Sequence, residues 1–301
     1  MIKEIDTGSG VLGISTTEAG NVKIEYYRGK DITVRVPEKI EGSRVTEIGK
    51  KAFLSAKTIT GIELPDGITS IGDWAFASCT ALRQILFPGN KLSLGSGLFR
   101  DCVNLEKIVI RKAGFDGADI ASKRDIPYLL ALSVYKMDAP YLFDVEKAGT
   151  EDWIEHLDSV ITQILGKDDS EGFSKMLLCG EEDYVGDDSN LDTYVLLRKK
   201  EKIRILLARL IHDQGLSDKK REMFTTYLKE NMDKALWPLV LEEHGEDREY
   251  FDLLIDIGCI NNENVSKLID SMGDHYTQMK GYLIRFKGET GGGDFFGELE
   301  L

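Results

Sequence analysis

The chain has 301 residues, of which 42% are hydrophobic and 30% charged, and its formal net charge is -14. This composition argues against a wholly disordered, collagen-like or disulfide-dense polypeptide, and the length exceeds the roughly 100 to 200 residues that one core usually organises. We therefore expect two globular domains. The pI near 4.9 argues against nucleic acid, whose affinity for proteins comes largely from Lys and Arg, so a basic ligand or protein surface fits better.

Targeting signals and cysteine chemistry are both unremarkable. The apolar run at Val11 and Leu12 is far too short for a secretory signal, and no segment reaches the roughly 18 apolar residues of a membrane span. We therefore expect a cytoplasmic protein, with an extracellular adhesin as the alternative if a leader has been removed. The four cysteines form no CxxC pair, which argues against zinc ribbons and thioredoxin-like chemistry and favours reduced, buried thiols.

Residues 1–36 predict β structure. The runs 11–15, 22–27 and 32–36 alternate like strands and are separated by turn residues such as Gly20-Asn21. Because the segment that follows is repetitive, and because a stacked repeat has an open end that must be covered, we interpret residues 1–36 as a β cap.

A period of 23 residues organises the next part of the chain. Phe53, Phe76 and Phe99 keep this spacing, and so do several other columns of small and apolar residues. The agreeing columns are Gly49, Gly72 and Gly95; Ala52, Ala75 and Leu98; Ala56, Cys79 and Cys102; Ile59, Leu82 and Leu105; Ile62, Ile85 and Ile108; Leu64, Phe87 and Ile110. Such a period predicts stacked structural units, each burying its Phe in a shared core.

Each unit is predicted to hold one strand and one helical turn. Apolar residues alternate within the segments 59–64, 82–87 and 105–110, which predicts a short strand in each. A helical turn is predicted before each strand, in IGKKAF, IGDWAF and LGSGLF. The residues between the buried ones point outward. These outward residues are Gly61, Glu63, Gln84, Leu86, Lys107 and Val109. Leu86 and Val109 should be neighbours, flanked by Gln84 and Lys107, on a face that is either a binding surface or covered by the second half of the chain.

Three segments resemble the BspA-like leucine-rich repeats, whose pattern is V-T-x-I-G-x-x-A-F-x-x-C-x-x-L-x-x-I-x-I-P. They are VTEIGKKAFLSAKTITGIELP, ITSIGDWAFASCTALRQILFP and the decayed LSLGSGLFRDCVNLEKIVI. The resemblance covers about residues 30–111. It departs from the pattern at Ala56 in the first unit, and at Leu98 and Arg111 in the third, so the third unit is expected to be terminal. The resemblance implies a solenoid that acts as a bacterial scaffold; the adhesive role of well-known members does not transfer without an export signal.

The period changes to 3.6 after residue 112, which predicts a helical second half. Candidate helices span 126–137, 151–165, 172–179, 191–212, 218–231, 233–243, 248–257, 263–272 and 275–287. N-cap residues are predicted at Thr150, Asn190, Ser217 and Asp247, and left-handed glycines that end helices at Gly245, Gly258, Gly273 and Gly288. The glycine rhythm resembles degenerate ankyrin-type helix pairs, which implies an α-solenoid.

The two halves differ in charge. Residues 1–111 hold 15 Lys and Arg against 13 Asp and Glu, whereas the remainder holds 23 against 39, so the acidity belongs to the helical half. That acidity is either a solvated surface or a docking face for a basic partner. The basic run 198–204 lies beside an apolar stripe that includes Ile203 and Leu207, so we predict that its charges face mostly solvent rather than nucleic acid.

The last segment, residues 288–301, reads GETGGGDFFGELEL. A frayed terminus is one interpretation. The other is a short segment that becomes ordered when it docks into a groove, with Phe295 and Phe296 as the anchors.

The motifs that resemble cofactor-binding or metal-binding sites are rejected because the sequence around them does not fit such sites. GxGxxG at residues 8–13 is followed by strand-like sequence rather than a helix, and the acidic stretch 181–192 fits no register of a calcium loop. The four histidines, His156, His212, His244 and His275, form no HExxH pair, and GxSxG and P-loop motifs are missing, so we expect isolated surface or capping histidines.

The sequence therefore predicts an α+β protein: a β cap and leucine-rich repeats over 1–111, an α-helical, ankyrin-like domain over 112–287 and a flexible acidic tail over 288–301. We expect a non-enzymatic protein-interaction scaffold without cofactor, metal or catalytic residues. Its protein partners, for which a basic surface is one candidate, would contact Gln84, Leu86, Lys107, Val109, Phe295 and Phe296. The rival hypothesis is an enzyme with an unrecognised site between the two domains.

Overall fold

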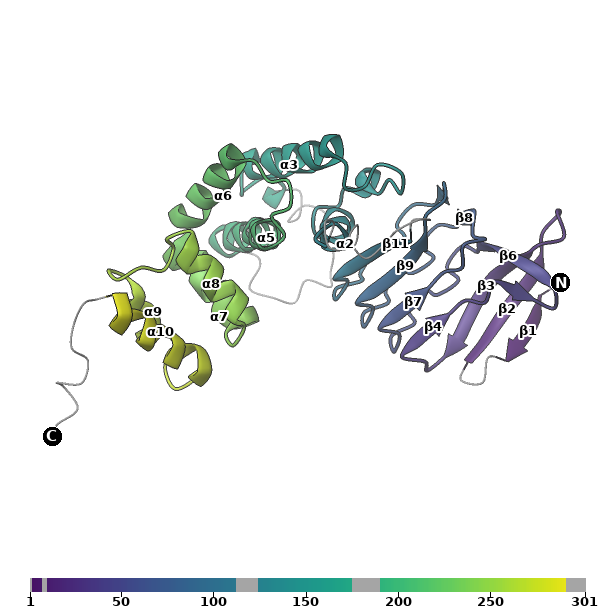
Figure 1. The fold of residues 1–301 in the computed structure, drawn as a ribbon, viewed down its shortest axis with the longest axis horizontal. Helices are drawn as coiled ribbons and strands as arrows, with labels where there is room; N and C mark the ends of the chain where they lie inside the picture. Colours follow the sequence, from purple (N-terminus) through teal and green to yellow (C-terminus); the bar gives the residue numbers. More distant parts are fainter. Residues whose placement is uncertain (1, 7–9, 112–123, 175–189, 291–301) are drawn as a thin grey trace. The chain divides into compact units, whose positions relative to one another are not determined.

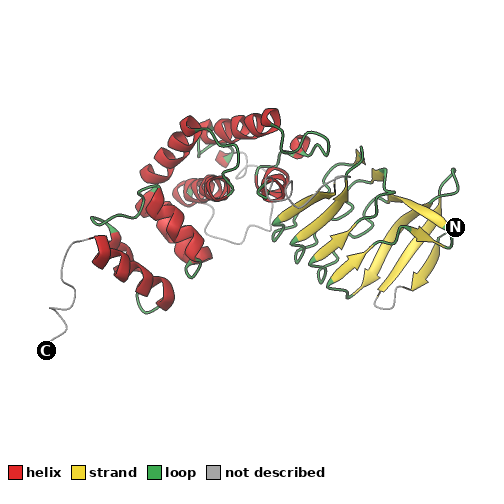
Figure 2. Cartoon of the chain, viewed as in Figure 1, coloured by secondary structure: helices red, strands yellow, loops and turns green. Residues whose placement is uncertain are grey.

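A computed structural model describes residues 2–6, 10–111, 124–174 and 190–290. The chain divides into two compact units, Met1–Val160 and Ile161–Leu301. Strands and turns make up the first part of unit 1 and helices make up unit 2 (Figures 1 and 2). The predicted α+β class, with stacked coils followed by a helical region, is confirmed.

The N-terminal strands form an antiparallel meander. Strand β1 (Lys3–Asp6) pairs with β2 (Gly10–Thr16), which pairs with β3 (Val22–Gly29). Strand β3 then runs parallel to β6 (Ser43–Ile48), the first strand of the repeats, so the meander continues the sheet of the solenoid. The strands predicted at 11–15 and 22–27 are confirmed, whereas β1 was not predicted.

The repeats build two parallel sheets. In the first, β6 pairs with β8 (Ser70–Ile71) and β8 with β10 (Ser93–Leu94). The second sheet consists of β4 (Thr33–Arg35), β7 (Gly61–Glu63), β9 (Gln84–Pro88) and β11 (Lys107–Arg111). Its strands lie side by side in the order β11-β9-β7-β4 and form a row in Figure 1. A short strand β5 (Lys39–Ile40) pairs antiparallel with β6. Ile108 pairs with Ile85 and Ile85 with Ile62, so each coil advances the predicted 23 residues.

The predicted helical turns are hydrogen-bonded turns rather than helix. Lys51, Trp74 and Gly97 occupy one column and all have left-handed backbones, with φ of 60°, 58° and 61°. The amide of Phe53 donates to the carbonyl of Ala75 at 2.7 Å, as the amide of Phe76 does to Leu98 at 3.1 Å. Because these amides bond to the next coil, they are not available for bonds along a helix.

One aromatic column fills the solenoid. The rings of Tyr27, Phe53, Phe76 and Phe99 stack in that order, with centroid distances of 5.5, 5.7 and 5.6 Å. Phe53 and Phe76 are fully buried. The predicted alignment of the three phenylalanines is confirmed, and the β cap adds Tyr27, which lies outside the 23-residue register. Burial, together with a hydrogen bond to Asp31 at 2.7 Å, raises the pKa of Tyr27 to about 12.

A second column consists of buried thiols. The Sγ of Cys79 donates to the carbonyl of Phe53 at 3.0 Å, and that of Cys102 donates to the carbonyl of Phe76 at 3.1 Å. Each thiol therefore ties its coil to the preceding one. Burial raises the pKa of Cys79 from 9.0 to about 11 and that of Cys102 to about 12.

These two thiols should make unit 1 sensitive to alkali. Their stabilisation is complete below pH 9.0, where both states hold the proton, and it falls as the pH rises towards 11 and 12, because only the unfolded state ionises readily. The expected loss is at most about 1.4 kcal/mol per thiol for each pH unit in this range. Urea unfolding followed by hydrogen exchange of unit 1 should show a shallower loss between pH 9 and about 11 for the Cys79→Ala/Cys102→Ala variant than for the parent. Equal slopes would contradict the assignment.

Unit 1 continues beyond the repeats. Helix α2 (Ile126–Ala131) runs into a π-helical turn at Leu132–Lys136, followed by a 3-10 turn at Pro140–Leu142. The ring of Phe143 packs edge-on against Phe87 at 4.9 Å and Phe99 at 6.4 Å, so this segment covers the last coil. The last strand of the repeats ends at Arg111 and α2 begins at Ile126, while the compact unit extends to Val160 because the open end of a solenoid needs a cover.

The helices after this cap largely match the prediction. They are α3 (Glu151–Gly166), α5 (Leu191–Ile211), α6 (Asp218–Glu230), a π-helical turn at Met232–Leu236, α7 (Trp237–His244), α8 (Arg248–Asp256), α9 (Val265–Ser271) and α10 (Thr277–Thr290). The helix predicted at 172–179 lies mostly outside the described residues. A helical region is therefore established, and its ankyrin-like character stays a prediction.

Helix ends show where local signals succeed. All four predicted caps accept a first-turn amide; Asn190, for example, accepts from Asp192 at 2.8 Å, and Ser217, Asp247 and Thr150 act similarly. Gly258 and Gly273 are left-handed as predicted. The same prediction is wrong for Gly245, whose φ is -62°, and for Gly288, which lies inside α10. A Cβ on Gly245 would meet the Tyr276 ring at 2.2 Å, so packing rather than a left-handed backbone requires this glycine.

The basic run on α5 is not a solvated face throughout. Lys202 is 4% exposed, forms an ion pair with Asp169 at 2.6 Å and donates to the carbonyl of Lys167 at 2.6 Å. Arg204 binds Glu243 of α7, and Lys200 binds Glu242 at 2.8 Å. The prediction of a wet face is therefore wrong for Lys202, because its ammonium caps the carbonyl end of α3.

Candidate functional site

The outward face of the β4-β7-β9-β11 sheet presents two rows of side chains. Pairing of β9 with β11 puts Gln84 opposite Lys107 and Leu86 opposite Val109. Both rows continue across β7 and β4; the first reaches Thr33 through Gly61, and the second reaches Arg35 through Glu63. The four strand residues predicted to bind a partner are thus brought together, because the 23-residue register stacks equivalent positions of successive coils.

A groove of about 650 Å³ lies over the last two strands of this face. All four predicted residues line it, and α2 supplies its other wall. The remaining lining residues are Ile108, Ile110, Arg111, Arg124, Ile126, Pro127, Tyr128, Leu130 and Ala148. Most of this lining is apolar, and the outward side chains of Leu86 and Val109 are half-buried rather than covered.

Within unit 1, the groove shows what lies beside the predicted strand residues. Helix α2, which the sequence assigned to the second domain, packs beside β11 and forms a wall without filling the space above Leu86 and Val109. Sequence reasoning missed Tyr128, Ile126 and Arg124, which lie outside the repeat. The segment was predicted only as part of the helix 126–137, and a helical pattern carries no information about where the helix packs.

Cations are the charged groups of the groove. Lys107 places its Nζ 4.7 Å from the centre of the Tyr128 ring. Arg111 pairs with Asp66 at 2.6 Å, and the Nε of Arg124 lies 3.5 Å from its neighbour Asp125. Among the described lining residues there is no carboxylate, histidine or cysteine. This arrangement provides an apolar floor with positive charge around it, which suits binding better than acid-base or nucleophilic chemistry.

The other end of the sheet face is polar and electrically balanced. A cleft of about 420 Å³ runs over β4 and β7 and shares Gln84 and Lys107 with the groove. Here Arg35 pairs with Glu63 at 3.0 Å and Arg83 with Glu106 at 3.1 Å. Both pairs are exposed, so they contribute little stability, but they continue the surface away from the groove.

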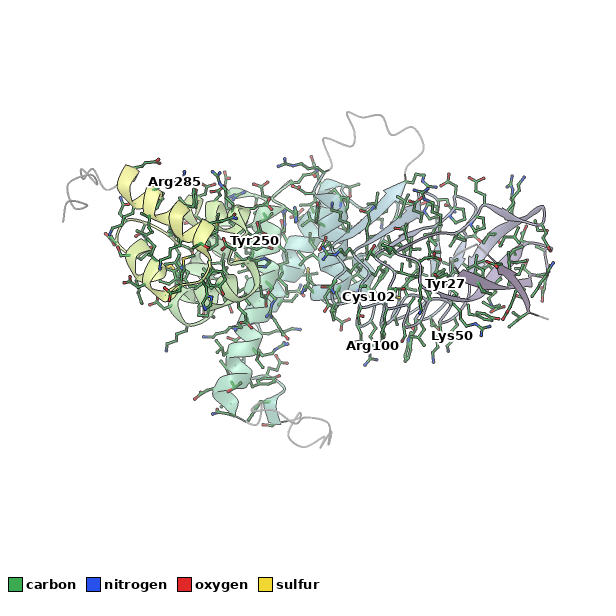
Figure 3. All side chains as sticks on the ribbon, turned by 90° about the horizontal axis from the view of Figure 1, so that it is seen from below. Tyr27, Lys50, Arg100, Cys102, Tyr250 and Arg285 are labelled. Atoms are coloured by element: carbon green, nitrogen blue, oxygen red, sulfur yellow. The ribbon has the colours of Figure 1, made fainter. Side chains whose placement is uncertain are left out.

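A separate exposed cluster lies on the turns. The ring of Trp74 is flanked by the Nζ of Lys51 at 5.2 Å and the guanidinium of Arg100 at 5.9 Å from its centre. Arg100 and Lys50 project from the same edge of unit 1 in Figure 3. The cation-π contacts account for this arrangement within the fold.

The other residues that the sequence singled out either make ordinary contacts or lie outside the described residues. Phe295 and Phe296, and most of the acidic stretch 181–192, lie outside the described residues. His244 stacks on Tyr250 at 3.6 Å. In the described part of the chain no three His, Cys, Asp or Glu side chains are grouped so as to hold a metal ion. The helices there are also too short or too polar to cross a bilayer.

The repeat region resembles a known protein family. Residues 38–116 match the model of the BspA type leucine rich repeat region. A leucine rich cell surface protein from Faecalibacterium prausnitzii is 25% identical, with a TM-score of 0.31, over 36% of this chain and 30% of its own. A leucine-rich repeat protein from Bacteroides capillosus (22% identity, TM-score 0.28) matches over 36% of this chain and 99% of its own. The leucine rich repeat protein of T. pallidum (24%, 0.26) matches over 35% and 71%.

Each of these structural matches covers 36% of the chain or less. The chain spans less than a third of the length of the Faecalibacterium protein. No curated protein sequence matches it.

Proposed function

Residues 38–116 are a BspA-type leucine-rich-repeat region, and from this premise we propose that the protein is a non-enzymatic scaffold that binds a partner protein through the groove between β9, β11 and α2. Leucine-rich repeats are commonly protein-interaction modules. A rigid scaffold lowers the entropic cost of binding, because the contact residues are already held in place by the stacked coils.

The observation that carries this proposal is the groove itself. A space of about 650 Å³ with a mostly apolar lining stands over Leu86 and Val109, at the face where the repeats place outward side chains. Burying apolar side chains there releases water from both surfaces, which supplies the driving force for association. The cations beside the floor orient the partner.

Leu86→Asp is expected to abolish partner capture without unfolding the protein. The side chain is half-buried on the outward face, so an aspartate keeps its hydration in the free protein but places a charge in the floor that a partner must cover. We expect at least about a tenfold loss of capture from native lysate, measured by quantitative mass spectrometry.

Leu54→Asp is the matched control, since Leu54 is 41% exposed on a turn and does not line the groove. A captured set that is the same for the parent and for Leu86→Asp contradicts the proposed function of the groove. A truncation before Gly291 in the same experiment tests the predicted docking of Phe295 and Phe296, which would be refuted by an unchanged set.

The acidic second half of the chain, residues 112–301, supports a second part of the proposal. Lys and Arg number 23 against 39 Asp and Glu after residue 111, and several of the cations, including Lys200 and Arg204, are paired internally. The excess negative charge would speed the encounter with a basic surface at low salt. We also propose a cytoplasmic location, in keeping with the buried free thiols of Cys79, Cys102 and Cys259, which cell fractionation tests.

A further inference from the structure

We infer that the groove selects an extended, acidic and apolar peptide segment, in which Asp or Glu lies next to Leu, Ile or Phe. This inference rests on the proposed function, because it names the chemistry of the partner at the same site. It has the opposite sign to the basic partner expected from the net charge of the chain.

Lys107 is the residue from which we infer that the peptide is acidic. Its side chain is half-buried, its Nζ lies over the Tyr128 ring, and no carboxylate of the described residues pairs with it. Arg111 and Arg124 each have one carboxylate neighbour. A carboxylate brought in by a partner would therefore meet an ammonium that is partly shielded from water and that pairs with no carboxylate in the described part of the chain, which strengthens the attraction.

The charge around the groove favours the same sign. The described lining residues include Lys107, Arg111 and Arg124 and no acidic side chain. Residues 1–111, which contain Lys107 and Arg111, are close to neutral, with 15 basic against 13 acidic side chains, so these two cations are not outweighed by their own part of the chain. A basic peptide would meet like charge at each of the three positions, whereas an acidic peptide meets none within the lining.

The floor requires apolar side chains from the same peptide. Leu86 and Val109 are directly opposite each other on adjacent strands, and α2 adds Ile126, Pro127 and Leu130 from the side. Lys107 and Gln84 line both the groove and the polar cleft over β4 and β7. A segment that places apolar side chains on the floor and a carboxylate at Lys107 can therefore continue over the polar strip, which favours an extended chain over a compact ligand.

Selection from a phage-displayed library of random short peptides on the immobilised full-length protein tests this inference. Peptides recovered on the parent should be enriched in Asp or Glu beside Leu, Ile or Phe. Lys107→Glu should reverse the charge preference and yield peptides enriched in Lys and Arg, because the position then attracts the opposite sign. For the best acidic peptide, fluorescence anisotropy should show a loss of affinity of about tenfold or more on Lys107→Glu.

Lys91→Glu provides the matched control, since it makes the same charge change at an exposed position outside the groove. An empty selection, a selection without acidic enrichment, or the same preference on Lys107→Glu would overturn the inference. Reversal cannot result from unfolding, because an unfolded variant gains no new specificity. If Leu86→Asp abolishes capture from lysate while the selection shows no charge preference, the proposed function stands and only the choice of an acidic segment fails.

Discussion

Replacing Phe76 by alanine is expected to lower the free energy of unfolding of unit 1 by about 3–5 kcal/mol, as for other fully buried phenylalanines. The ring has no exposed surface and lies between Phe53 at 5.7 Å and Phe99 at 5.6 Å, with Phe87 packed against its edge at 6.4 Å. Removing it leaves a cavity in the middle of the column, and the coils on both sides are held apart by their own hydrogen bonds, so collapse can relieve only part of the loss.

Hydrogen exchange of unit 1 peptides in increasing urea is the appropriate measurement, because the chain has two compact units and need not unfold in one step. Leu54→Ala is the matched control: this side chain is 41% exposed and should change stability by less than about 0.5 kcal/mol. Exchange in unit 2 should stay unchanged. A Phe76→Ala protein as stable as Leu54→Ala would contradict the stacked core.

Replacing Gly72 by alanine is expected to destabilise unit 1 by about 1–3 kcal/mol or more, although it adds only one methyl group. A Cβ at this position would lie 2.5 Å from the amide nitrogen of Lys50 and 2.9 Å from the carbonyl carbon of Gly49. Both are backbone atoms of the preceding coil, so no side chain can move aside. The coils must separate, which weakens the bond from the Gly72 amide to the Ile48 carbonyl, now 2.8 Å long.

Gly61→Ala is the control within the same solenoid. Its Cβ would meet the Thr33 side chain at 3.5 Å and the Gln84 carbonyl oxygen at 4.0 Å, both ordinary contacts, so the substitution should be neutral or slightly stabilising. Thermal unfolding of both variants, with hydrogen exchange to assign the transition to unit 1, separates the two cases. If Gly72→Ala and Gly61→Ala have equal stability, the glycine column is not explained by close approach of the coils.

The repeat could be recognised from the sequence because every coil packs the same types of residue at equivalent positions. Phe53, Phe76 and Phe99 occupy equivalent places, so their spacing alone predicted the column that the structure contains. Tyr27 has the same role in the cap but was not foreseen, because it lies 26 residues before Phe53 rather than 23. Helix starts at Asn190 and Ser217 were predictable for a related reason, since an N-cap depends on only a few neighbouring residues.

Local patterns failed where a distant partner decides the outcome. Lys202 belongs to a run that looks solvated, yet its ammonium is buried against the end of α3, more than thirty residues earlier in the chain. Gly245 resembles a helix-ending glycine, but the Tyr276 ring explains it. Neither contact can be predicted from the residues that are adjacent in the sequence.

The same distinction between local pattern and distant contact applies to the candidate site. The sequence by itself determined that Gln84, Leu86, Lys107 and Val109 share one face, because strand alternation and a constant period place equivalent residues side by side. Only the tertiary structure decided that this face is one wall of a groove, because α2 lies outside the repeat and its position depends on how it covers the last coil. A repeated sequence pattern predicts the contacts that recur in every coil. The contacts of a cap occur only once in the fold, so no repeated pattern predicts them.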